Sequence, residues 1–344
     1  MTRKNIRRIA TEEAFNVKPV ANELRRIARG PSDSQDMALV RMIYDTPAGT
    51  EPTVPNILEH LLDLEGERIR DMDENGVAVQ LLSLTAPGVQ MFDADMAVEL
   101  AAQANDILAG AIARHPTRLA GLAAFAPHAP RRAALEMERA IRKLKLNGFI
   151  VSSHTHNQYL DDPLFYPILE AAEALDGCIY IHPRAPSSLM AGVTRLYGME
   201  SALWGYNMEV NNHAMRLIYS GVFDRFPKLK ICIGHMGEGV PFLLWRQDYW
   251  VNRAGRERRN PPLELLPSEY FERNFVITTS GMEDPLALDF CIKKIGADKI
   301  LWAIDYPYQP TAPAVAFLDN APITEEQREM IYWKNAARVF HIGN

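Results

Sequence analysis

Short apolar runs recur along the chain and alternate with longer amphipathic segments. The runs are rich in β-branched and aromatic residues and end abruptly in polar ones, which is typical of buried parallel strands. Eight such strands are predicted, at residues 6–13, 77–84, 118–125, 148–153, 178–183, 229–235, 275–281 and 300–306. The segments between them are long enough for helices.

Several of the intervening segments carry helix start and stop signals. Asn56 followed by Glu59 predicts a capping box, and Gly76 predicts the end of the same helix. Further helix starts are predicted at the pairs Asp162-Pro163, Asp284-Pro285 and Thr324–Gln327.

Strands that alternate with helices call for a parallel sheet, and eight such units are the number that closes a (β/α)₈ TIM barrel. The competing architecture is a doubly wound open sheet. It is disfavoured because no glycine-rich phosphate-binding turn follows the first strand. We therefore predict one α/β domain over residues 1–344, with long loop insertions at 16–55, after the first strand, and at about 184–205, after the fifth.

Composition narrows the class of protein. The 344 residues are 47% hydrophobic and 23% charged, which is enough apolar material for a large core. The net charge of −6 argues against nucleic acid as a partner, and no apolar run reaches the ~18 residues that a membrane span needs. Cys178, Cys232 and Cys291 all lie in apolar segments, so we expect free thiols and a cytoplasmic location.

Side chains with metal-binding or proton-carrying chemistry stand where five of the predicted strands end. They are Glu12 or Glu13, His154, His182, His235 with Glu238, and Asp305. The C-terminal ends of barrel strands meet at one mouth, so these groups are predicted to converge there. Carboxylate and imidazole ligands suit Zn²⁺, Mn²⁺ or Mg²⁺, with positions left for water or substrate.

Each of these residues also has a plainer interpretation. A single histidine after an apolar strand is commonly a hydrogen-bonded structural residue, and His154 flanks a loop, where an exposed position is the default. Glu12 and Glu13 are adjacent, so only one of them can point inward if the strand alternates there. Asp305 is the hardest to explain away, because an acid that ends so apolar a run must be paired, metal-bound or shifted in pKa.

Five segments together resemble the metal-dependent decarboxylase branch of the amidohydrolase superfamily. They are 9–15 (IATEEAF), 84–90 (LTAPGVQ), 180–183 (YIHP), 234–238 (GHMGE) and 305–308 (DYPY). That branch includes aminocarboxymuconate semialdehyde decarboxylase and the γ-resorcylate, 2,3-dihydroxybenzoate and 5-carboxyvanillate decarboxylases. The resemblance runs through most of the chain, with the five segments in the expected order.

The resemblance implies a non-oxidative decarboxylase of an ortho-hydroxybenzoate that uses one divalent metal ion. It implies that Glu12, His182 and Asp305 hold the metal, that His235 and Glu238 form the adjacent proton-handling pair, and that Arg246 and Tyr308 contact the substrate. The chemistry of decarboxylation needs an acid, for which Asp305 is the candidate. Further candidates for substrate contact are Tyr44, Thr85 and His154. In this family the arginine often reaches the site across a subunit interface, which implies a homodimer or homotetramer.

The substrate is narrowed to a small aromatic acid such as 5-carboxyvanillate or a dihydroxybenzoate. A second carboxylate on the ring would need a cation beside it, because an uncompensated charge in a closed site is costly. The candidates for that cation are Arg41, Arg184 and Arg246.

One motif departs from the family, and it bears on the alternatives. Many members have Glu-x-His on the first strand, whereas this chain has Ala14 in the histidine's place. Binuclear hydrolases of the superfamily use His-x-His there and a bridging lysine on the fourth strand, but Lys145 precedes that strand. A mononuclear hydrolase such as a lactonase, a hydratase and a non-catalytic barrel remain as alternatives.

Overall fold

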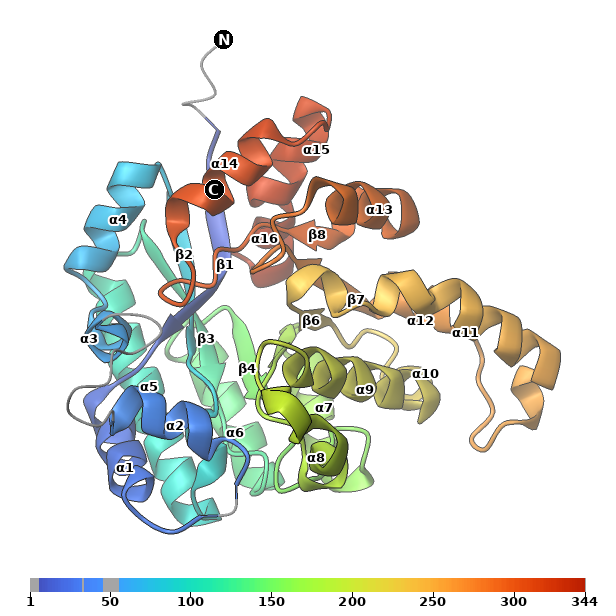
Figure 1. Cartoon of the computed structure of the whole chain (residues 1–344), viewed down its shortest axis with the longest axis horizontal. Helices are drawn as coiled ribbons and strands as arrows, with labels where there is room; N and C mark the ends of the chain where they lie inside the picture. The colour runs from blue at the N-terminus through green and yellow to red at the C-terminus, as the bar shows by residue number, and fades with distance from the viewer. Residues whose placement is uncertain (1–5, 33, 46–55, 344) are drawn as a thin grey trace.

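The protein is described here by a computed structural model that covers residues 6–32, 34–45 and 56–343. Eight parallel strands form one sheet in which every strand pairs with the next along the chain. Figure 1 shows this sheet curled into a barrel, as the alternation of apolar runs and helices predicts. The strands are β1 (Ile9–Phe15), β2 (Val79–Leu84), β3 (Leu119–Ala124), β4 (Gly148–Ser152), β5 (Ile179–His182), β6 (Ile231–Ile233), β7 (Phe275–Thr278) and β8 (Ile300–Leu301).

Helices follow each strand and pack outside the sheet (Figure 1). Those after β2 to β5 are η2 (Gly88–Met91), α5 (Ala94–Arg114), α6 (Pro130–Arg142), η3 (Pro163–Phe165), α7 (Tyr166–Ala174), α8 (Ser188–Thr194), η4 (Leu196–Gly198), α9 (Gly205–Tyr219) and α10 (Val222–Arg225). Those after β6 to β8 are η5 (His235–Gly237), α11 (Val240–Ala254), η6 (Arg256–Arg258), α12 (Pro267–Asn274), α13 (Pro285–Ile295), η7 (Ala297–Lys299), α14 (Thr311–Asn320), α15 (Glu325–Glu329), η8 (Met330–Lys334) and α16 (Asn335–Phe340).

The last strand is much shorter than its apolar run predicts. β8 ends at Leu301, and residues 302–305 continue beside β1 without joining a strand ladder. Two backbone bonds tie this segment to β1: the Thr11 amide donates to the Trp302 carbonyl and the Ala14 amide donates to the Tyr306 carbonyl. Asp305 therefore lies in the loop after β8, not at the end of the strand.

The prediction of one helix from Asn56 to Gly76 is wrong, both in its continuity and in its N-terminal cap. Two helices, α3 (Ile57–Leu62) and α4 (Glu67–Asn75), stand there instead. Asp63 separates them, because its carboxylate accepts the backbone amides of Glu65 and Gly66 and so caps α4. Asn56 has a left-handed backbone (φ 54°) and makes no side-chain cap, whereas Gly76 ends α4 as predicted.

Three other predicted helix starts are confirmed. Asp162 accepts the Leu164 amide, Asp284 accepts the Leu286 amide, and Thr324 with Gln327 forms a reciprocal capping box.

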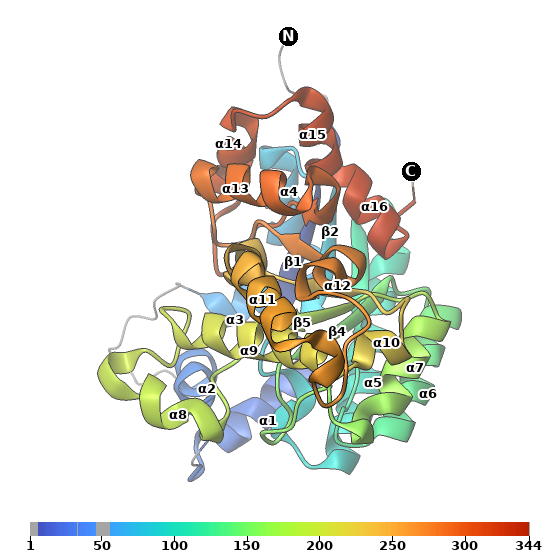
Figure 2. The ribbon, with the colours of Figure 1, turned by 90° about the vertical axis from the view of Figure 1, so that its right-hand side faces the viewer.

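The two long insertions contain helices that the sequence analysis did not predict. The first carries α1 (Lys18–Ala28) and α2 (Met37–Tyr44), and the second carries α8. A buried ion pair between Asp36 and Arg184 joins the two insertions, and Figure 2 shows α2 and α8 on the same side of the barrel. The part of the first insertion from 46 to 55 lies outside the described residues.

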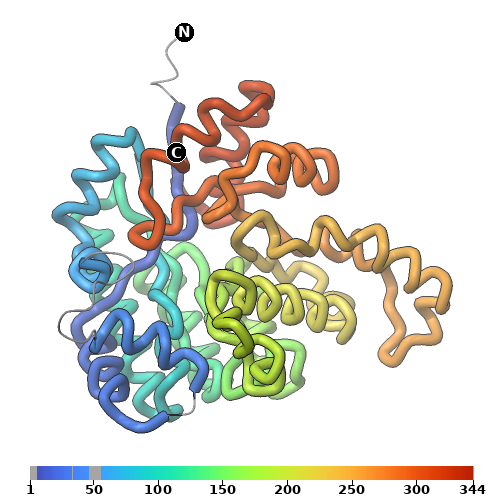
Figure 3. The backbone as a smooth tube through the Cα atoms, in the orientation of Figure 1, coloured from blue at the N-terminus to red at the C-terminus, as the bar shows by residue number. Residues whose placement is uncertain are grey.

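The end of the chain packs against its beginning. Helix α16 contacts both β1 and β8, and Figure 3 shows the C-terminal segment beside the first strand. Among the described helices, none has the length and apolar character to cross a membrane.

Candidate active site

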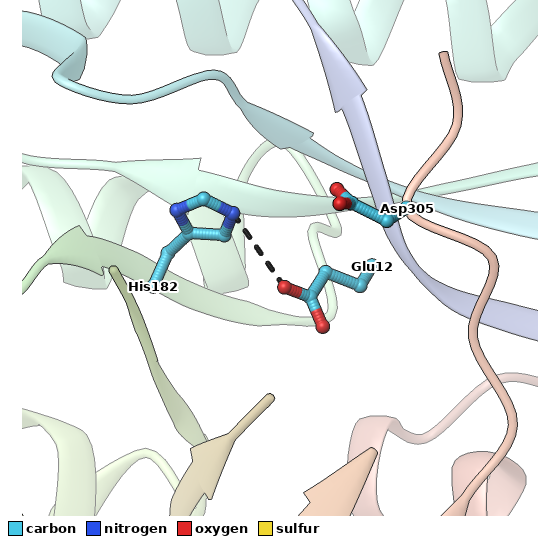
Figure 4. A group of neighbouring side chains, drawn as sticks. All are labelled: Glu12, His182 and Asp305. Atoms are coloured by element: carbon cyan, nitrogen blue, oxygen red, sulfur yellow. Dashed lines mark ion pairs between the residues drawn. The ribbon is translucent and has the colours of Figure 1, made fainter. Parts of the chain in front are cut away.

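Three side chains predicted as metal ligands meet at the mouth of the barrel. Glu12 comes from β1, His182 is the last residue of β5, and Asp305 comes from the loop after β8. One donor atom from each lies within 4.8 Å of the other two (Figure 4). The dashed line in Figure 4 joins Glu12 Oε1 to His182 Nε2, which are 3.5 Å apart.

The two oxygens of the Glu12 carboxylate have different surroundings. Oε2 accepts hydrogen bonds from the hydroxyls of Thr278 (2.8 Å), Tyr180 and Ser280. Oε1 is buried and has no hydrogen-bond partner among the described residues. A buried carboxylate oxygen without a partner is costly unless something cationic sits beside it.

Gly234 makes room for this carboxylate. A Cβ at that position would stand 2.9 Å from Glu12 Oε2 and 3.2 Å from the Tyr180 hydroxyl, so a larger residue would displace them.

His182 has the tautomer that a metal ligand needs. Its Nδ1 lies 2.7 Å from the Pro183 carbonyl, to which it donates. The proton is therefore on Nδ1, and Nε2 presents a lone pair toward Glu12 Oε1. The free Oε1, the free Nε2 and the nearby carboxylate of Asp305 fit one divalent metal ion.

The charges at this cluster are strongly coupled. Burial opposes ionisation of Glu12, but the imidazoles of His235 and His182 and the surrounding hydroxyls hold its pKa below the usual range. Burial and the negative charge of Glu12 raise the pKa of Asp305 well above the usual range. A bound divalent cation favours the ionised form of both carboxylates and so works against the shift at Asp305.

His235 and Glu238 form a hydrogen-bonded pair beside the cluster. His235 Nδ1 lies 2.7 Å from Glu238 Oε1, and His235 Nε2 lies 3.8 Å from Glu12 Oε1. Although burial disfavours the charged ring, the carboxylates of Glu238 and Glu12 raise the pKa of His235 to about 10. In the metal-free site these two carboxylates therefore favour the imidazolium form of the ring at neutral pH.

Helix α9 holds the Glu238 end of this pair. Asn207 Nδ2 donates to Glu238 Oε2 (3.2 Å), and Asn211 Nδ2 donates to the Glu238 carbonyl (3.0 Å). The turn itself is unusual, because His235, Met236 and Glu238 all have left-handed backbone angles. Such conformations cost energy and persist where the surrounding structure fixes them, commonly at functional sites.

Three neighbouring tyrosines, Tyr308, Tyr44 and Tyr206, lie near Asp305. The Tyr308 hydroxyl lies 2.7 Å from Thr85 Oγ1, so these two candidates for substrate contact lie side by side. Tyr44 is buried in α2, and its hydroxyl accepts a hydrogen bond from Asn16 Nδ2. Burial, followed by the neighbouring Tyr308, raises the pKa of Tyr44.

Tyr206 and Asn207 were not among the site residues predicted from the sequence. Tyr206 lines the same cavity as His235 and Glu238. Burial, followed by the charges of Asp36 and Tyr308, raises the pKa of Tyr206. Tyr206 and Asn207 begin α9 directly after an insertion, in a stretch with no motif and no strand end. An aromatic and an amide at a helix start was the only available hint.

Three other candidates for substrate contact, His154, Arg184 and Arg41, make hydrogen bonds or ion pairs with other parts of the chain. His154 is buried, not exposed, and its Nε2 lies 3.1 Å from the Ala185 carbonyl; burial, followed by Arg184, lowers its pKa to about 4. It lines a separate cavity of about 340 Å³ together with Arg184. Arg184 is already paired with Asp36, and Arg41 donates to the carbonyls of Ala28 and Gly30.

Arg246 is exposed on α11. It is not among the described residues that line the cavity beside the site of its own chain.

A cavity of about 860 Å³ opens beside the His235–Glu238 pair. Its walls combine Tyr206 and Asn207 from α9 with apolar side chains that include Phe242 of α11. Ligand sites of this size are typically apolar with a few placed polar groups, and this one could accept an aromatic ring.

Comparison with known proteins agrees with this geometry. The amidohydrolase family profile matches residues 41–342. A γ-resorcylate decarboxylase of Polaromonas sp. is 37% identical over 84% of this chain and 91% of its own length. A 5-carboxyvanillate decarboxylase structure from Sphingomonas paucimobilis is 52% identical, with a TM-score of 0.94 over 98% of this chain and all of the other.

A third relative carries a metal and a ligand. The 5-carboxyvanillate decarboxylase of Novosphingobium aromaticivorans, in complex with manganese and 4-hydroxy-3-methoxy-5-nitrobenzoic acid, is 36% identical. It has a TM-score of 0.93 over 99% of this chain and 97% of the other. The barrel, the metal-binding cluster and these matches agree, and the chain belongs to the amidohydrolase family, in its metal-dependent decarboxylase branch.

Proposed function

We propose that the protein is a metal-dependent, non-oxidative decarboxylase of an ortho-hydroxybenzoate, with 5-carboxyvanillate as the first candidate substrate. The observation that carries this proposal is the unpartnered Glu12 Oε1, which faces His182 Nε2 beside the His235–Glu238 pair. The 5-carboxyvanillate decarboxylase from Sphingomonas paucimobilis is 52% identical to this chain, against 37% for the γ-resorcylate decarboxylase of Polaromonas sp., which favours 5-carboxyvanillate over a dihydroxybenzoate.

Glu12, His182 and Asp305 would hold one divalent metal ion. The manganese in the Novosphingobium relative supports Mn²⁺ as the first choice, with Zn²⁺ and Mg²⁺ as the others. When bound, the metal supplies a Lewis acid that a phenolate and an adjacent carboxylate can chelate, which fixes the ring in place.

Asp305 is the proposed acid. Removal of CO₂ from an arene leaves an electron pair on the ring carbon, so that carbon must first receive a proton. Asp305 would deliver the proton to the carbon that bears the carboxylate. The carbon–carbon bond then breaks, its electrons restore the aromatic ring, and CO₂ leaves. In the metal-free site, burial and the charge of Glu12 favour the protonated form of this acid, and a bound metal opposes that shift.

His235 and Glu238 would stabilise the phenolic oxygen in its ionised form. The imidazolium that the two neighbouring carboxylates favour can donate a hydrogen bond to that oxygen and steady the dearomatised intermediate. Tyr308 and Thr85 would contact the substrate, with Tyr44 beside them. Tyr206 joins this set as a candidate that the structure adds.

The substrate site is proposed to be completed across a subunit interface. Helix α11 exposes an aromatic face whose members are Phe242, Trp245, Tyr249 and Trp250, the first of which is 75% exposed. A patch of this kind is typical of a subunit contact. We propose a homodimer or homotetramer in which Arg246 of the partner subunit binds a substrate carboxylate.

A hydrolase of the same superfamily is the main alternative, and one feature disfavours its binuclear form. That chemistry uses a bridging lysine on the fourth strand, but here β4 ends at Ser152 and is followed by Ser153. Lys145 precedes the strand and is exposed. A mononuclear lactonase or a hydratase is separated from the proposal by its product.

The test is a screen for CO₂ release with Mn²⁺, Zn²⁺ or Mg²⁺ supplied in turn. Its substrates are 5-carboxyvanillate, salicylate, the dihydroxybenzoates and a lactone panel. Release from an ortho-hydroxybenzoate is expected. Metal-loaded protein that hydrolyses a lactone and releases no CO₂ from any of the acids would overturn the proposal.

A further inference from the structure

Two adjacent glutamates on β1 are both buried, although strand side chains normally alternate. Glu12 is 2% exposed and Glu13 is 0% exposed. The pairing register explains this, because Ala10 pairs with Gln80 but Glu13 pairs with Leu82, so β1 contains an extra residue there. Such a bulge changes the direction in which side chains point. Glu12 therefore reaches the metal-binding cluster, whereas Glu13 reaches the segment after β8.

Glu13 holds the main chain on both sides of Asp305. Its Oε1 accepts the Ile304 amide (3.0 Å), and its Oε2 accepts the Tyr306 amide (3.2 Å). Asp305 between them has a left-handed backbone (φ 76°), which is rare for a residue with a side chain. A single carboxylate thus fixes both neighbours of a residue in an unfavourable conformation.

The start of this segment is held by other groups: the Trp302 amide donates to the Ile331 carbonyl, and the Ala303 amide donates to Thr279 Oγ1. The two amides that flank Asp305 donate to Glu13. β8 has ended at Leu301, so no strand ladder holds residues 302–305.

Arg68 is also fully buried and donates to the Ala14 carbonyl (2.7 Å) and to Gln80 Oε1 (2.9 Å). Burial raises the pKa of Glu13 well above the usual range, and the positive charge of Arg68 acts in the opposite direction. In either protonation state the two carboxyl oxygens can accept the two backbone amides.

We propose that Glu13 is a positioning residue for Asp305: by holding the amides of Ile304 and Tyr306, it keeps the Asp305 carboxylate in place for the metal and the substrate. The inference rests on the proposed function for its effect on turnover. Its effect on metal binding follows from the cluster alone. Outer groups of this kind typically contribute about 10- to 100-fold to metal affinity or activity.

The test variant is Glu13→Gln. It has the same shape, but its amide nitrogen must face one of the two backbone amides, so one hydrogen bond becomes a contact between two donors. We expect the Kd for Mn²⁺, measured by calorimetric titration, to rise about tenfold or more. We expect kcat, measured with the substrate that the wild-type protein decarboxylates, to fall by a similar factor. Glu13→Asp keeps the carboxyl group but is too short to reach both amides, and it is the test variant if Glu13→Gln does not fold.

A cycle with Asp305→Asn separates positioning from general stability. If Glu13 acts through Asp305, the loss of Mn²⁺ affinity in the double variant equals that of Asp305→Asn alone. The matched control is Asn335→Ala. Asn335 bridges two backbone carbonyls at the other end of β8, those of Ala297 (2.8 Å) and Ile300 (2.7 Å). It should lower the melting temperature and leave Mn²⁺ affinity unchanged.

Folded Glu13 variants with wild-type Mn²⁺ affinity and kcat would overturn the inference, as would additive losses in the cycle. The failure of the proposed function looks different. In that case the wild type binds Mn²⁺ and releases no CO₂, and the metal titrations still decide the role of Glu13.

Discussion

Asp305 has two proposed roles, because it is both a candidate metal ligand and the proposed acid. Burial and the neighbouring Glu12 charge favour its protonated form, while a metal ion favours its ionised form. The protonation state of Asp305 therefore depends on whether the metal is bound.

Asp305→Asn should fold normally and lose most of its turnover. Its amide can neither donate the proton nor provide a ligand charge, so kcat should fall by roughly 100- to 10,000-fold. Steady-state CO₂ release measures this, with circular dichroism to verify the fold. Near-normal turnover in the folded variant would refute the role of Asp305.

His235 and Glu238 should differ in importance. His235 faces the cluster, whereas Glu238 orients it from behind, so Glu238→Gln should retain more activity than His235→Asn. Loss of an orienting group typically costs about 10- to 100-fold. Asn207→Ala should be milder still, because it removes one 3.2 Å bond to the far oxygen of Glu238. Measurement of kcat for the three variants checks the order, and a larger loss for Asn207→Ala than for His235→Asn would contradict it.

The sequence identified the ligands because each lies at or just after an apolar run. His182 ends β5, and Asp305 follows the run at 300–304. Glu13 was considered only as an alternative to Glu12, because strict alternation lets one of the pair point inward. The bulge that turns both side chains inward depends on the partner strand β2, and no local pattern reveals it.

Among the elements, the strands were predicted best, since buried parallel strands are short, apolar and similar to one another. All eight expected runs contain a strand, although β8 occupies only the start of its run and β1 extends past the end of its own. Helices α1, α2 and α8 were missed because the insertions were judged by their length alone. Yet α1 buries Val20, Ala21, Leu24 and Ala28, a helical spacing that can be found in the sequence.

The junction of β4 and α9 predicts how stability depends on pH. His213 is buried in α9, and its Nε2 accepts the Leu160 amide (3.0 Å), so the proton is on Nδ1, which donates to Ser153 Oγ. Burial, followed by His154, lowers the pKa of His213 to about 3. The folded state therefore keeps this ring neutral at pH values where the unfolded chain protonates it.

Because the pKa of His213 is lowered in the folded state, the neutral ring stabilises the folded protein at higher pH. The contribution is fully present above pH ~6.5, the ordinary value for histidine, and is lost as pH falls towards 3. Denaturant unfolding at several pH values from 7.5 down to 4.5 should show that the free energy of unfolding decreases as the pH is lowered. The part due to His213 has a limiting slope of about 1.4 kcal/mol per pH unit. His213→Gln should remove that part of the slope, and an unchanged slope would refute the assignment.

For the whole molecule, the exposed aromatic face of α11 suggests that an isolated chain is incomplete. Trp245 and Tyr249 stack on it with ring centroids 5.5 Å apart, and Arg246 lies between them in sequence. If the arginine serves a partner's site, two inactive variants should complement one another. Arg246→Met mixed with Asp305→Asn, after reversible dissociation, should regain activity. A mixed site then combines native Asp305 with native Arg246 of the partner subunit.

Complementation has a matched control in the same experiment. Each variant alone, taken through the same dissociation, should remain inactive, and light scattering should report dimers or larger assemblies in every sample. Absence of activity in a mixture whose hybrid dimers have been verified would show that Arg246 does not act across the interface.

Metal-dependent decarboxylation is tested most directly by CO₂ release from 5-carboxyvanillate by metal-free protein to which Mn²⁺ is added back. We expect no release without metal, and release with one equivalent of Mn²⁺ that is lost in Asp305→Asn. Release that is unaffected by removal of the metal, or Mn²⁺ bound at Glu12, His182 and Asp305 with no CO₂ from any ortho-hydroxybenzoate, would contradict this expectation.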